Sequence, residues 1–292
     1  IKLPNEIIII NSSHKKLLVK KYLQTFFKIK KIKVKTINAI NVLPGHARNI
    51  GIKNSTHQIL AFLDVETVPL NNWLQHSYNL LNKGYEIVWG ITIYKAEKFK
   101  EKIIRACTFG KNKIVTIPGS IIKKKTFDKI GLFLEKYRAG EDGDLLRRAK
   151  LHNIRHINSK SFISYTGLKN LKYTQIIKKW FRNYLISKNL DHIQSHKEIY
   201  FFSLSILILL FIFNWNSMFA HWDTSSPIYM PHITKISLII LFLIYFIIRG
   251  AYLPLKKGVE IGFILPFNFF LIFILSLIID ITKIIAFLKP RK

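Results

Sequence analysis

The apolar and polar residues of the first 165 positions follow two periods in turn, which predict strands and helices. Residues 6–11 form a short apolar run that ends in polar residues, as in a buried strand. In residues 14–28, pairs of apolar residues alternate with pairs of mostly polar residues, so that lysines lie opposite the apolar face, as in an amphipathic helix. Residues 32–37 alternate apolar and polar side chains, which predicts a half-buried strand. The same criteria predict strands at 58–63, 86–94, 114–117 and 154–165, and helices at 47–54, 72–82, 98–109, 124–130 and 142–152.

This alternation of strands and helices predicts an α/β fold, with a largely parallel sheet covered by helices on both faces. The sequence Pro118-Gly119-Ser120 is expected to interrupt the apolar run that begins at residue 114. We therefore predict one domain over residues 1–170.

Residues 171–198 follow as a predicted basic amphipathic segment. Apolar and aromatic side chains, Trp180 among them, lie on one face, and Lys and Arg side chains, including Arg182, lie on the other. Such a helix suits the membrane–water interface. The alternative is a helix that packs on its own domain.

Residues 199–292 contain three apolar stretches, at about 199–219, 233–249 and 262–279. A bilayer core needs about 20 apolar residues, so the first two are predicted transmembrane helices. The third contains Pro266 and Asn268, and it is either a third span or a re-entrant segment. The basic residues at the end of the chain conflict with a third complete span, and the tail could instead lie along the interface.

Loop charges predict which side each loop occupies. Residues 221–232 carry no Lys or Arg, whereas residues 249–257 carry three. Basic loops stay on the cytoplasmic side, so the first domain is expected in the cytoplasm, at the cytoplasmic (inner) membrane of a bacterium.

The net charge of +30 arises from 46 basic and 16 acidic residues. Such an excess suits anionic partners, which include lipid headgroups, nucleotide phosphates and nucleic acid, although it could equally be a solvated surface. The single cysteine, Cys107, excludes an internal disulfide and a CxxC metal site, and it suits a reducing compartment.

Two acidic clusters are candidates for chemistry. Asp64-Val65-Glu66 follows the strand predicted at 58–63, where two carboxylates could approach one divalent cation, although a solvated turn has the same composition. Glu141 and Asp142 open a predicted helix, where acids are stabilised by the helix dipole. A carboxylate at that position could also act as a general base.

The order of these motifs resembles glycosyltransferase family 2, whose members are nucleotide-sugar transferases of the GT-A fold. The similarity covers about residues 4–165. It rests on Ala-Arg-Asn-Ile-Gly at 47–51, Phe-Leu-Asp-Val-Glu at 62–66, Trp73-Leu74, Gly119-Ser120, residues 127–131 and Gly-Glu-Asp at 140–142.

The resemblance implies a role for each matching residue. Asp64 and Glu66 stand at the metal motif and would hold Mn²⁺ or Mg²⁺ on the donor diphosphate. Asp142 stands at the position of the catalytic base, with Glu141 beside it on the acceptor side. Arg48 falls where the family's loop approaches the donor. The other implied site residues are Asn11 and Asn49 at the donor and Gly119 and Ser120 at the sugar or acceptor, with Trp180 and Arg182 as candidates for the diphosphate or the interface.

Four features depart from the family pattern. Glu66 replaces the usual second Asp, and Asn11 replaces an Asp that contacts the base of the nucleotide. The QxxRW motif of processive synthases is absent, because Gln175, Lys179 and Trp180 differ from it in spacing and residue type. The chain also begins about where the family's second strand is expected.

The leading hypothesis is an inverting glycosyltransferase that moves a sugar from a UDP- or GDP-type donor to a lipid-linked or cell-envelope glycan acceptor at the cytoplasmic membrane face. The alternative is a non-catalytic GT-A-like membrane scaffold or binding protein. No nucleic-acid motif accompanies the positive charge, so nucleic acid is not an expected partner.

Overall fold

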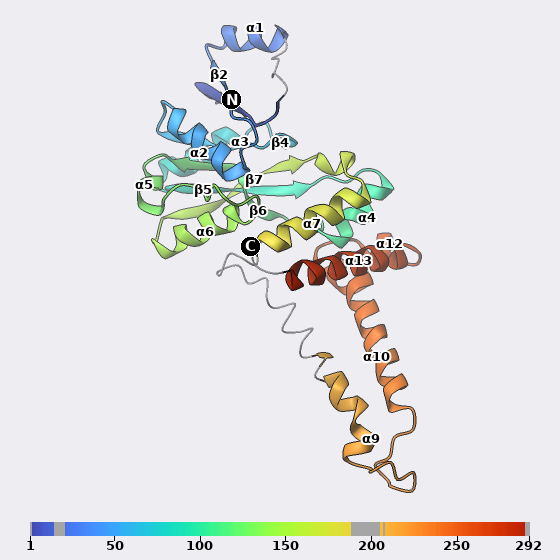
Figure 1. Cartoon of the computed structure of the whole chain (residues 1–292). Coiled ribbons are helices and arrows are strands. Elements are labelled where there is room, and N and C mark those ends of the chain that lie inside the picture. The colour runs from blue at the N-terminus through green and yellow to red at the C-terminus, as the bar shows by residue number, and fades with distance from the viewer. Residues whose placement is uncertain (1, 15–20, 188–204, 207, 290–292) are drawn as a thin grey trace. The chain divides into compact units, whose positions relative to one another are not determined.

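The computed structural model describes residues 2–14, 21–187, 205–206 and 208–289, and its elements are labelled in Figure 1. The chain forms two compact units. The first contains Ile1–Lys98 and Asn112–Leu171, and the second contains Phe99–Lys111 and Lys172–Lys292.

The first unit contains seven strands, five α-helices and one short 3-10 helix among its described residues. The strands are β1 (Glu6–Asn11), β2 (Lys33–Asn38), β3 (Ile59–Ala61), β4 (Thr67–Pro69), β5 (Ile87–Tyr94), β6 (Ile114–Lys123) and β7 (His156–Tyr165). The helices are α1 (Lys21–Ile29), α2 (Pro44–Asn54), α3 (Trp73–Asn82), α5 (Thr126–Ile130), α6 (Glu141–Leu151) and the 3-10 helix η1 (Gly167–Asn170). The helix predicted at 14–28 is described only from Lys21, because residues 15–20 lie outside the described part.

The prediction of a largely parallel sheet is wrong, because the main sheet is mixed. Its strand order is β3-β6-β5-β7-β4, in which the neighbours β5 and β7 pair in parallel and the other three neighbouring pairs are antiparallel. β1 and β2 form a separate parallel pair. Apolar runs buried on both faces do not encode strand direction, so the sequence pattern could not distinguish the two arrangements.

The expected interruption at Pro118 is also wrong. β6 runs through Pro118-Gly119-Ser120, and its pairing with β5 shifts register between Val88 and Gly90. The irregularity in the ladder accommodates the proline that would otherwise break it. The short strand β4 was not predicted; it pairs with β7 at the edge of the sheet, where Pro69 is tolerated.

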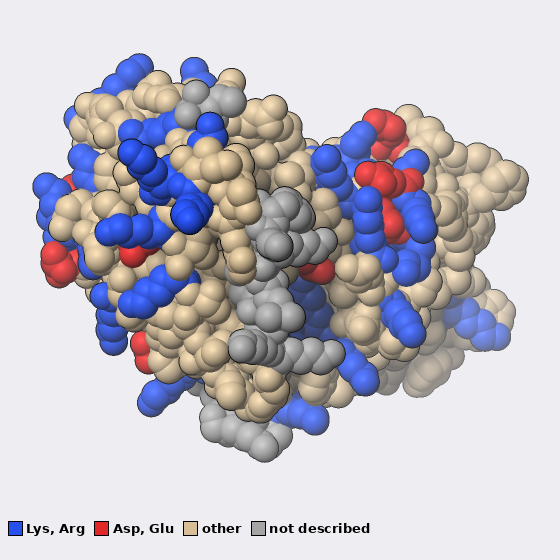
Figure 2. Space-filling view, turned by 90° about the horizontal axis from the view of Figure 1, so that it is seen from above, with Lys and Arg blue, Asp and Glu red and all other residues tan. Residues whose placement is uncertain are grey.

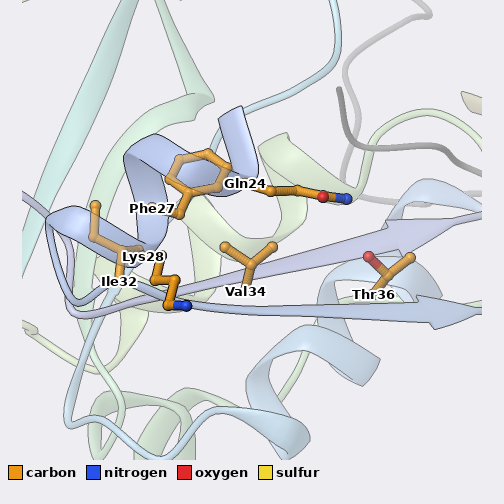
Figure 3. A pocket seen from close by; sticks show the side chains of 6 residues that line it. All are labelled: Gln24, Phe27, Lys28, Ile32, Val34 and Thr36. Carbon is orange, nitrogen blue, oxygen red and sulfur yellow. The ribbon is translucent and has the colours of Figure 1, made fainter. Parts of the chain in front are cut away.

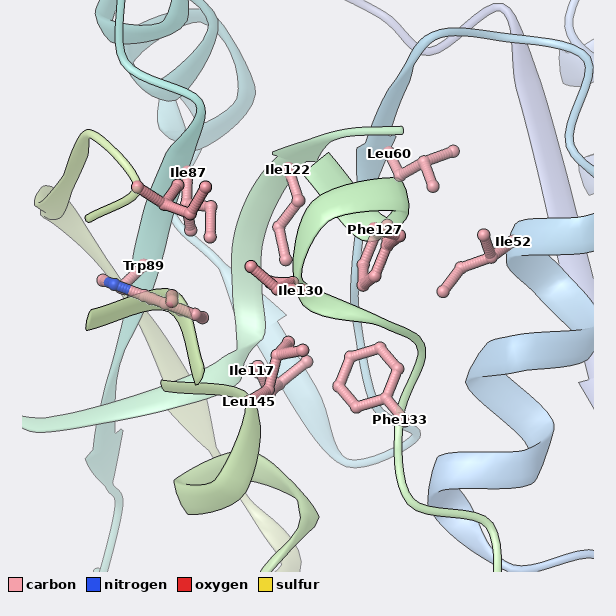
Figure 4. Packing of buried hydrophobic residues seen from close by; sticks show 12 residues of the cluster. Ile52, Leu60, Ile87, Trp89, Ile117, Ile122, Phe127, Ile130, Phe133 and Leu145 are labelled. Carbon is pink, nitrogen blue, oxygen red and sulfur yellow. The ribbon is translucent and has the colours of Figure 1, made fainter. Parts of the chain in front are cut away.

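Buried apolar side chains from the sheet and from α2, α5 and α6 form the core of the first unit (Figure 4). Trp89 and Ile122 come from adjacent strands, and Leu145 comes from α6; each is at most 1% exposed. Phe62, Phe127 and Phe133 meet with ring centroids 5.7–6.3 Å apart. The core thereby anchors the strand end before Asp64 and the segment that follows α5.

The second unit is helical. It contains α4 (Phe99–Cys107), α7 (Tyr173–Ser187), α9 (Trp215–Met218), α10 (Ile233–Ile247), the π-helix η2 (Ile248–Tyr252), α11 (Leu253–Lys256), α12 (Ile261–Ile264) and α13 (Asn268–Leu288). Within the described residues, Ile233–Lys256 and Asn268–Leu288 are long and apolar enough to cross a membrane, by length and composition alone. Part of the predicted span at 199–219 lies outside the described residues, and residues 208–213 are helical.

Basic side chains dominate the exposed charge. Figure 2 shows Lys and Arg spread over the visible face, with far fewer Asp and Glu side chains. This distribution agrees with the net charge of +30.

Gly90 offers a test of the β5–β6 packing. A Cβ atom there would overlap the Pro118 carbonyl and lie 2.8 Å from the Ser120 nitrogen. We expect Gly90→Ala to lower the free energy of unfolding by about 1–3 kcal/mol. Gly143→Ala is the matched control, since no atom lies within 4 Å of its Cβ position in α6. It should raise stability by about 0.5–1 kcal/mol. Unfolding of the full chain in detergent, followed by circular dichroism, measures both, and equal stability of the two variants would contradict the packing described.

Candidate functional site

Three carboxylates from two parts of the first unit converge on the Arg48 guanidinium. Arg48 Nη1 lies 3.1 Å from Glu141 Oε1 and 3.1 Å from Asp142 Oδ1. Its Nη2 lies 3.3 Å from Asp64 Oδ1. The Arg48 side chain is 11% exposed and that of Glu141 9%, whereas Asp142 is 36% and Asp64 49% exposed. The arginine is thus enclosed, and two of its partners remain accessible to a ligand.

Local structure brings each carboxylate to this point. Asp64 follows β3 in a turn closed by Thr67, whose hydroxyl donates to the Asp64 carbonyl at 2.6 Å. Glu141 and Asp142 open α6, directly after Gly140 in a left-handed conformation with φ 95°. The helix N-terminus favours negative charge there. The Ile117 N–H of β6 also donates to Asp142 Oδ2 at 3.3 Å.

Burial and repulsion make Asp142 a stronger base than an ordinary aspartate. The pKa of Asp142 is raised to about 6, mainly by desolvation and also by the neighbouring Glu141 and Asp64 charges. The Arg48 charge and the Ile117 N–H act in the opposite direction. Burial would lower the pKa of Arg48, but the three carboxylates outweigh it and raise that pKa overall. A pKa near 6 suits a group that accepts a proton near neutral pH.

Tyr94, at the end of β5, borders the same cluster. Burial, together with the charges of Asp142 and Asp64, raises its pKa to about 12. Its ring lies 5.1 Å from the Tyr165 ring at the end of β7. Two parallel strands therefore end in neighbouring tyrosines beside the carboxylates.

Glu66 has a different set of partners from Asp64. The Tyr165 hydroxyl donates to Glu66 Oε2 at 2.9 Å, and the Thr166 N–H donates to the Glu66 carbonyl at 2.8 Å. Burial and the bonded Glu66 carboxylate raise the pKa of Tyr165. The Glu66 backbone is left-handed, with φ 28°, and a Cβ atom at Gly167 would overlap its carboxylate. Glu66 is therefore held in one place by a tight turn.

Several residues predicted to contact the donor or acceptor are engaged with the chain itself. Asn49 is 1% exposed; its amide donates to the Phe133 carbonyl and to Glu135, and accepts from the Phe133 N–H. Ser120 is fully buried; its hydroxyl accepts from Gly90 N at 2.7 Å and donates to the Thr116 carbonyl at 2.9 Å. Both side chains therefore fix the backbone around the site.

Asn11 and Gly119 occupy other positions in the first unit. Asn11 ends β1, and its amide donates to Asn38 at the end of β2 at 3.0 Å. Gly119 lies within β6 at φ 84°, and its carbonyl accepts a 2.7 Å bond from the buried Trp73 indole. Trp73 thereby ties α3 to the middle of the sheet.

Trp180 and Arg182 lie on α7 in the second unit. The Trp180 ring lies 6.3 Å from Phe109, and Lys283 Nζ lies 5.3 Å from its centroid. Arg182 is exposed.

The donor set around Asp64 fits a divalent cation that takes most of its ligands from a bound molecule. Three carboxylates face one guanidinium, so negative charge exceeds positive charge at the site. Carboxylate oxygens are the ligands that Mg²⁺ and Mn²⁺ prefer, often one or two together with phosphate and water. In the described part of the chain, no group of three or more His, Cys, Asp or Glu side chains is arranged to hold a metal ion alone.

A separate hollow of about 320 Å³ lies between α1 and β2 (Figure 3). Its lining residues are Gln24, Phe27, Lys28, Ile32, Val34 and Thr36. It contains no carboxylate, so it lacks the groups that the acidic cluster supplies.

The sequence pattern missed Tyr94, Tyr165, Gly167 and Phe133. Phe133 packs against Arg48, with the guanidinium carbon 5.4 Å from the ring centroid. The two tyrosines end predicted strands, and strand ends carry ligand-binding groups in α/β sheets. Their position at the ends of predicted strands was therefore the signal by which the sequence could have identified the two tyrosines. Gly167 and Phe133 had none, because their roles depend on contacts across the chain.

Comparison with known proteins gives one family and several distant structures. The model of the family "Glycosyl transferase family 2" matches residues 2–140. No curated protein matches the chain.

Three solved structures illustrate the structural likeness. GalNAc-T7 with UDP, GalNAc and Mn²⁺ has 15% identity and a TM-score of 0.41, covering 56% of this chain and 38% of that chain. TarS 1–349 of S. aureus in complex with UDP-GlcNAc has 15% identity and a TM-score of 0.37, covering 66% and 60%. The mannosyltransferase PcManGT from Pyrobaculum calidifontis in complex with GDP-Man and Mn²⁺ has 10% identity and a TM-score of 0.46, covering 97% and 78%. The chain thus spans less than two thirds of the first two.

The family match confirms the predicted α/β GT-A fold class, with the correction that its sheet is mixed. Its residues 2–140 include Arg48, Asp64 and Glu66 and end directly before Glu141 and Asp142. Residues 2–140 of this chain thus match glycosyltransferase family 2.

Proposed function

We propose that this protein is an inverting glycosyltransferase that transfers a sugar from a nucleotide-diphosphate donor to an acceptor hydroxyl. The arrangement of Asp64, Glu141 and Asp142 around Arg48 is the observation that carries the proposal. In this arrangement the exposed Asp64 carboxylate can bind a cation, and the Asp142 carboxylate, whose pKa is raised, can act as a base.

Asp142 is the general base. Its carboxylate accepts the proton of the acceptor hydroxyl while that oxygen forms a bond to the anomeric carbon. The bond from this carbon to the diphosphate oxygen breaks on the opposite face, and the nucleoside diphosphate leaves with the electron pair. Attack opposite the leaving group inverts the anomeric configuration. A base with a pKa of about 6 is largely ionised at neutral pH.

Asp64 and Glu66 would hold Mn²⁺ or Mg²⁺, which supplies positive charge to the diphosphate as it departs. Tyr165 positions Glu66 through its hydroxyl, and Gly167 leaves the space that the carboxylate occupies. The Arg48 guanidinium pairs with both Asp64 and Asp142. The carboxylate that faces the donor and the carboxylate that faces the acceptor therefore stay at a constant separation. We assign Asn49 and Ser120 to positioning the backbone.

The acceptor is a lipid-linked or cell-envelope glycan, and the reaction takes place at the cytoplasmic face of the membrane. The positive charge and the apolar helices support contact with membrane lipid. A UDP- or GDP-type donor fits a site built to receive a diphosphate. Trp180 and Arg182 remain predicted candidates for the diphosphate or the interface.

A binding protein without catalysis is the second candidate. The ion pairs of Arg48 already engage Asp64 and Asp142, as in a cluster that only stabilises a fold. The three variants below distinguish the two functions, because a scaffold has no turnover for them to change.

Asp142→Asn should abolish proton acceptance and lower transfer by about 10²- to 10⁴-fold with the fold intact. Because folding raises the Asp142 pKa, the stability of the parent falls as the pH rises through about 6, where this group ionises. Above that pH the variant, which carries no such charge, should therefore melt no lower than the parent. Transfer of radiolabelled sugar from UDP- and GDP-sugars, with Mn²⁺ and the full chain in lipid, measures the first effect. Asp128→Asn, at an exposed position of α5, is the control. Undiminished turnover in Asp142→Asn would remove Asp142 from the mechanism.

Arg48→Gln removes the cation that opposes the rise in the Asp142 pKa. The parent should lose activity as the pH falls through about 6. In the variant this loss should begin at higher pH, with the apparent pKa raised by about one unit or more. The pH profile of kcat/KM measures the shift. Arg147→Gln, which replaces a half-exposed arginine of α6, should keep the parent profile. If Arg48→Gln lost activity over the same acidic pH range as the parent, a group other than Asp142 would be the one that titrates.

Tyr165→Phe removes the hydrogen bond that orients Glu66. We expect the Mn²⁺ concentration for half-maximal activity to rise by about 10-fold, as for other residues that orient metal ligands. Tyr85→Phe, whose ring packs against Arg155, is the control. Equal Mn²⁺ dependence in both variants would exclude Glu66 as a ligand.

A further inference from the structure

α13 is long and apolar, but protein covers only one of its faces. Its inner face is buried and includes Ile272, Ser276, Ile279 and Ala286, each at most 1% exposed. Its outer face is a stripe at helical spacing, formed by Phe270, Ile274, Ile278, Ile281, Ile285 and Leu288, each at least 39% exposed. This outer stripe needs an apolar partner along its whole length.

Charged helices cover the inner face of α13. α4 and α7 pack against it. α4 carries Lys100, Lys102 and Arg105, and α7 carries Lys178 and Arg182. If α13 crossed a bilayer, these helices would enter the hydrocarbon with it, at a prohibitive cost in desolvated charge.

A polar cluster lies near the middle of α13. Asp280 accepts hydrogen bonds from Arg249 Nη2 at 2.9 Å and from the Tyr245 hydroxyl at 3.0 Å. It also forms ion pairs with Arg249 Nε at 2.6 Å and with Lys283 Nζ at 3.4 Å. Asp280 follows Asn268 by 12 residues, or about 18 Å of helix. In a helix that spans a core of about 30 Å, this cluster would lie near the centre of the bilayer.

α10 has the opposite character. It has no buried residue and carries no charge from Ile236 to Ile247. Its ring contacts with α13 come from its C-terminal half, where Phe242 lies 5.8 Å from Phe273 and Phe246 lies 4.5 Å from Phe269. α13 therefore crosses the C-terminal end of α10 instead of running along it, as Figure 1 also shows. Arg249 marks this end of α10 as the boundary between lipid and water.

We propose that α13 lies in the plane of the membrane, with its outer stripe in the acyl region of one leaflet, and that α10 crosses the bilayer. The partner is a phospholipid surface with anionic headgroups, because exposed Lys178, Arg182, Lys256 and Lys289 accompany the stripe in this unit. We thereby choose, among the alternatives that the sequence left open for the third apolar stretch, the one along the interface, and this choice is independent of the proposed enzymatic activity.

The arrangement also changes the role of α7. Its apolar face was expected to enter the interface, but Ile176 and Tyr184 are buried in the unit and α7 packs on α13. α13 is thus the element that contacts lipid, and α7 covers its inner face. The end of α13 lies on the same side of the membrane as α4 and α7.

Spin-label depth measurements test the proposal. Single cysteines at Phe270, Ile274, Ile278, Ile281 and Ile285, in the full chain with Cys107→Ala, are labelled in vesicles of phosphatidylethanolamine and phosphatidylglycerol. Accessibility to oxygen and to a water-soluble nickel complex should give one shallow depth for all five. Cysteines at Ile236, Ile240, Leu243 and Ile247 of α10 should give a depth that changes steadily along the helix. A depth on α13 that passes through the bilayer centre would overturn the proposal.

Sidedness gives an independent measurement. A membrane-impermeant maleimide should modify Leu288→Cys from the same side as Lys178→Cys of α7, and His232→Cys before α10 from the opposite side. Modification of Leu288→Cys and Lys178→Cys from opposite sides would show that α13 crosses. Circular dichroism of each variant identifies any that fail to fold, and the remaining positions still distinguish a constant depth from a crossing.

Discussion

The site depends on one guanidinium placed among three carboxylates. Asp64 lies in a turn after β3, and Glu141 and Asp142 open α6, so these parts of the chain meet only where Arg48 neutralises them. The residue next to it reinforces this position, because Asn49 binds the backbone of Phe133, whose ring packs against Arg48. α2 therefore holds the segment that precedes α6, and it supplies the positive charge that neutralises the carboxylates at the start of α6.

This charge balance also sets the chemistry. One cation does not neutralise three buried or half-buried carboxylates, and desolvation together with the remaining repulsion raises the pKa of Asp142 to about 6. The same excess of negative charge suits a divalent cation that brings a diphosphate with it. Glu66 stays outside the Arg48 cluster, in a turn fixed by Tyr165, so the longer side chain at this position has its own orienting partner.

The second unit follows a different constraint, which is the cost of charge in hydrocarbon. The helical run Ile233–Lys256, which begins with α10, and α13 are similar in length and apolar composition. They differ in what covers them: α10 has no buried residue, whereas α13 packs against two basic helices and carries a paired Asp280. The location that we propose for α13, in the plane of the membrane, would satisfy both of its faces.

Periodicity in the sequence determined most elements of the described chain, because a buried face repeats at the period of its own helix or strand. The family motifs likewise predicted Arg48, Asp64 and Asp142 as residues of one site, and these side chains form ion pairs with one another in the structure. Strand direction, the passage of β6 through Pro118 and the edge strand β4 depended on pairing between distant segments, which local patterns do not record. The same holds for Tyr165, Gly167 and the buried roles of Asn49 and Ser120. The orientation of α13 depends on which neighbours bury one of its faces. Hydropathy measures how apolar a helix is, and only the tertiary structure determines what surrounds it.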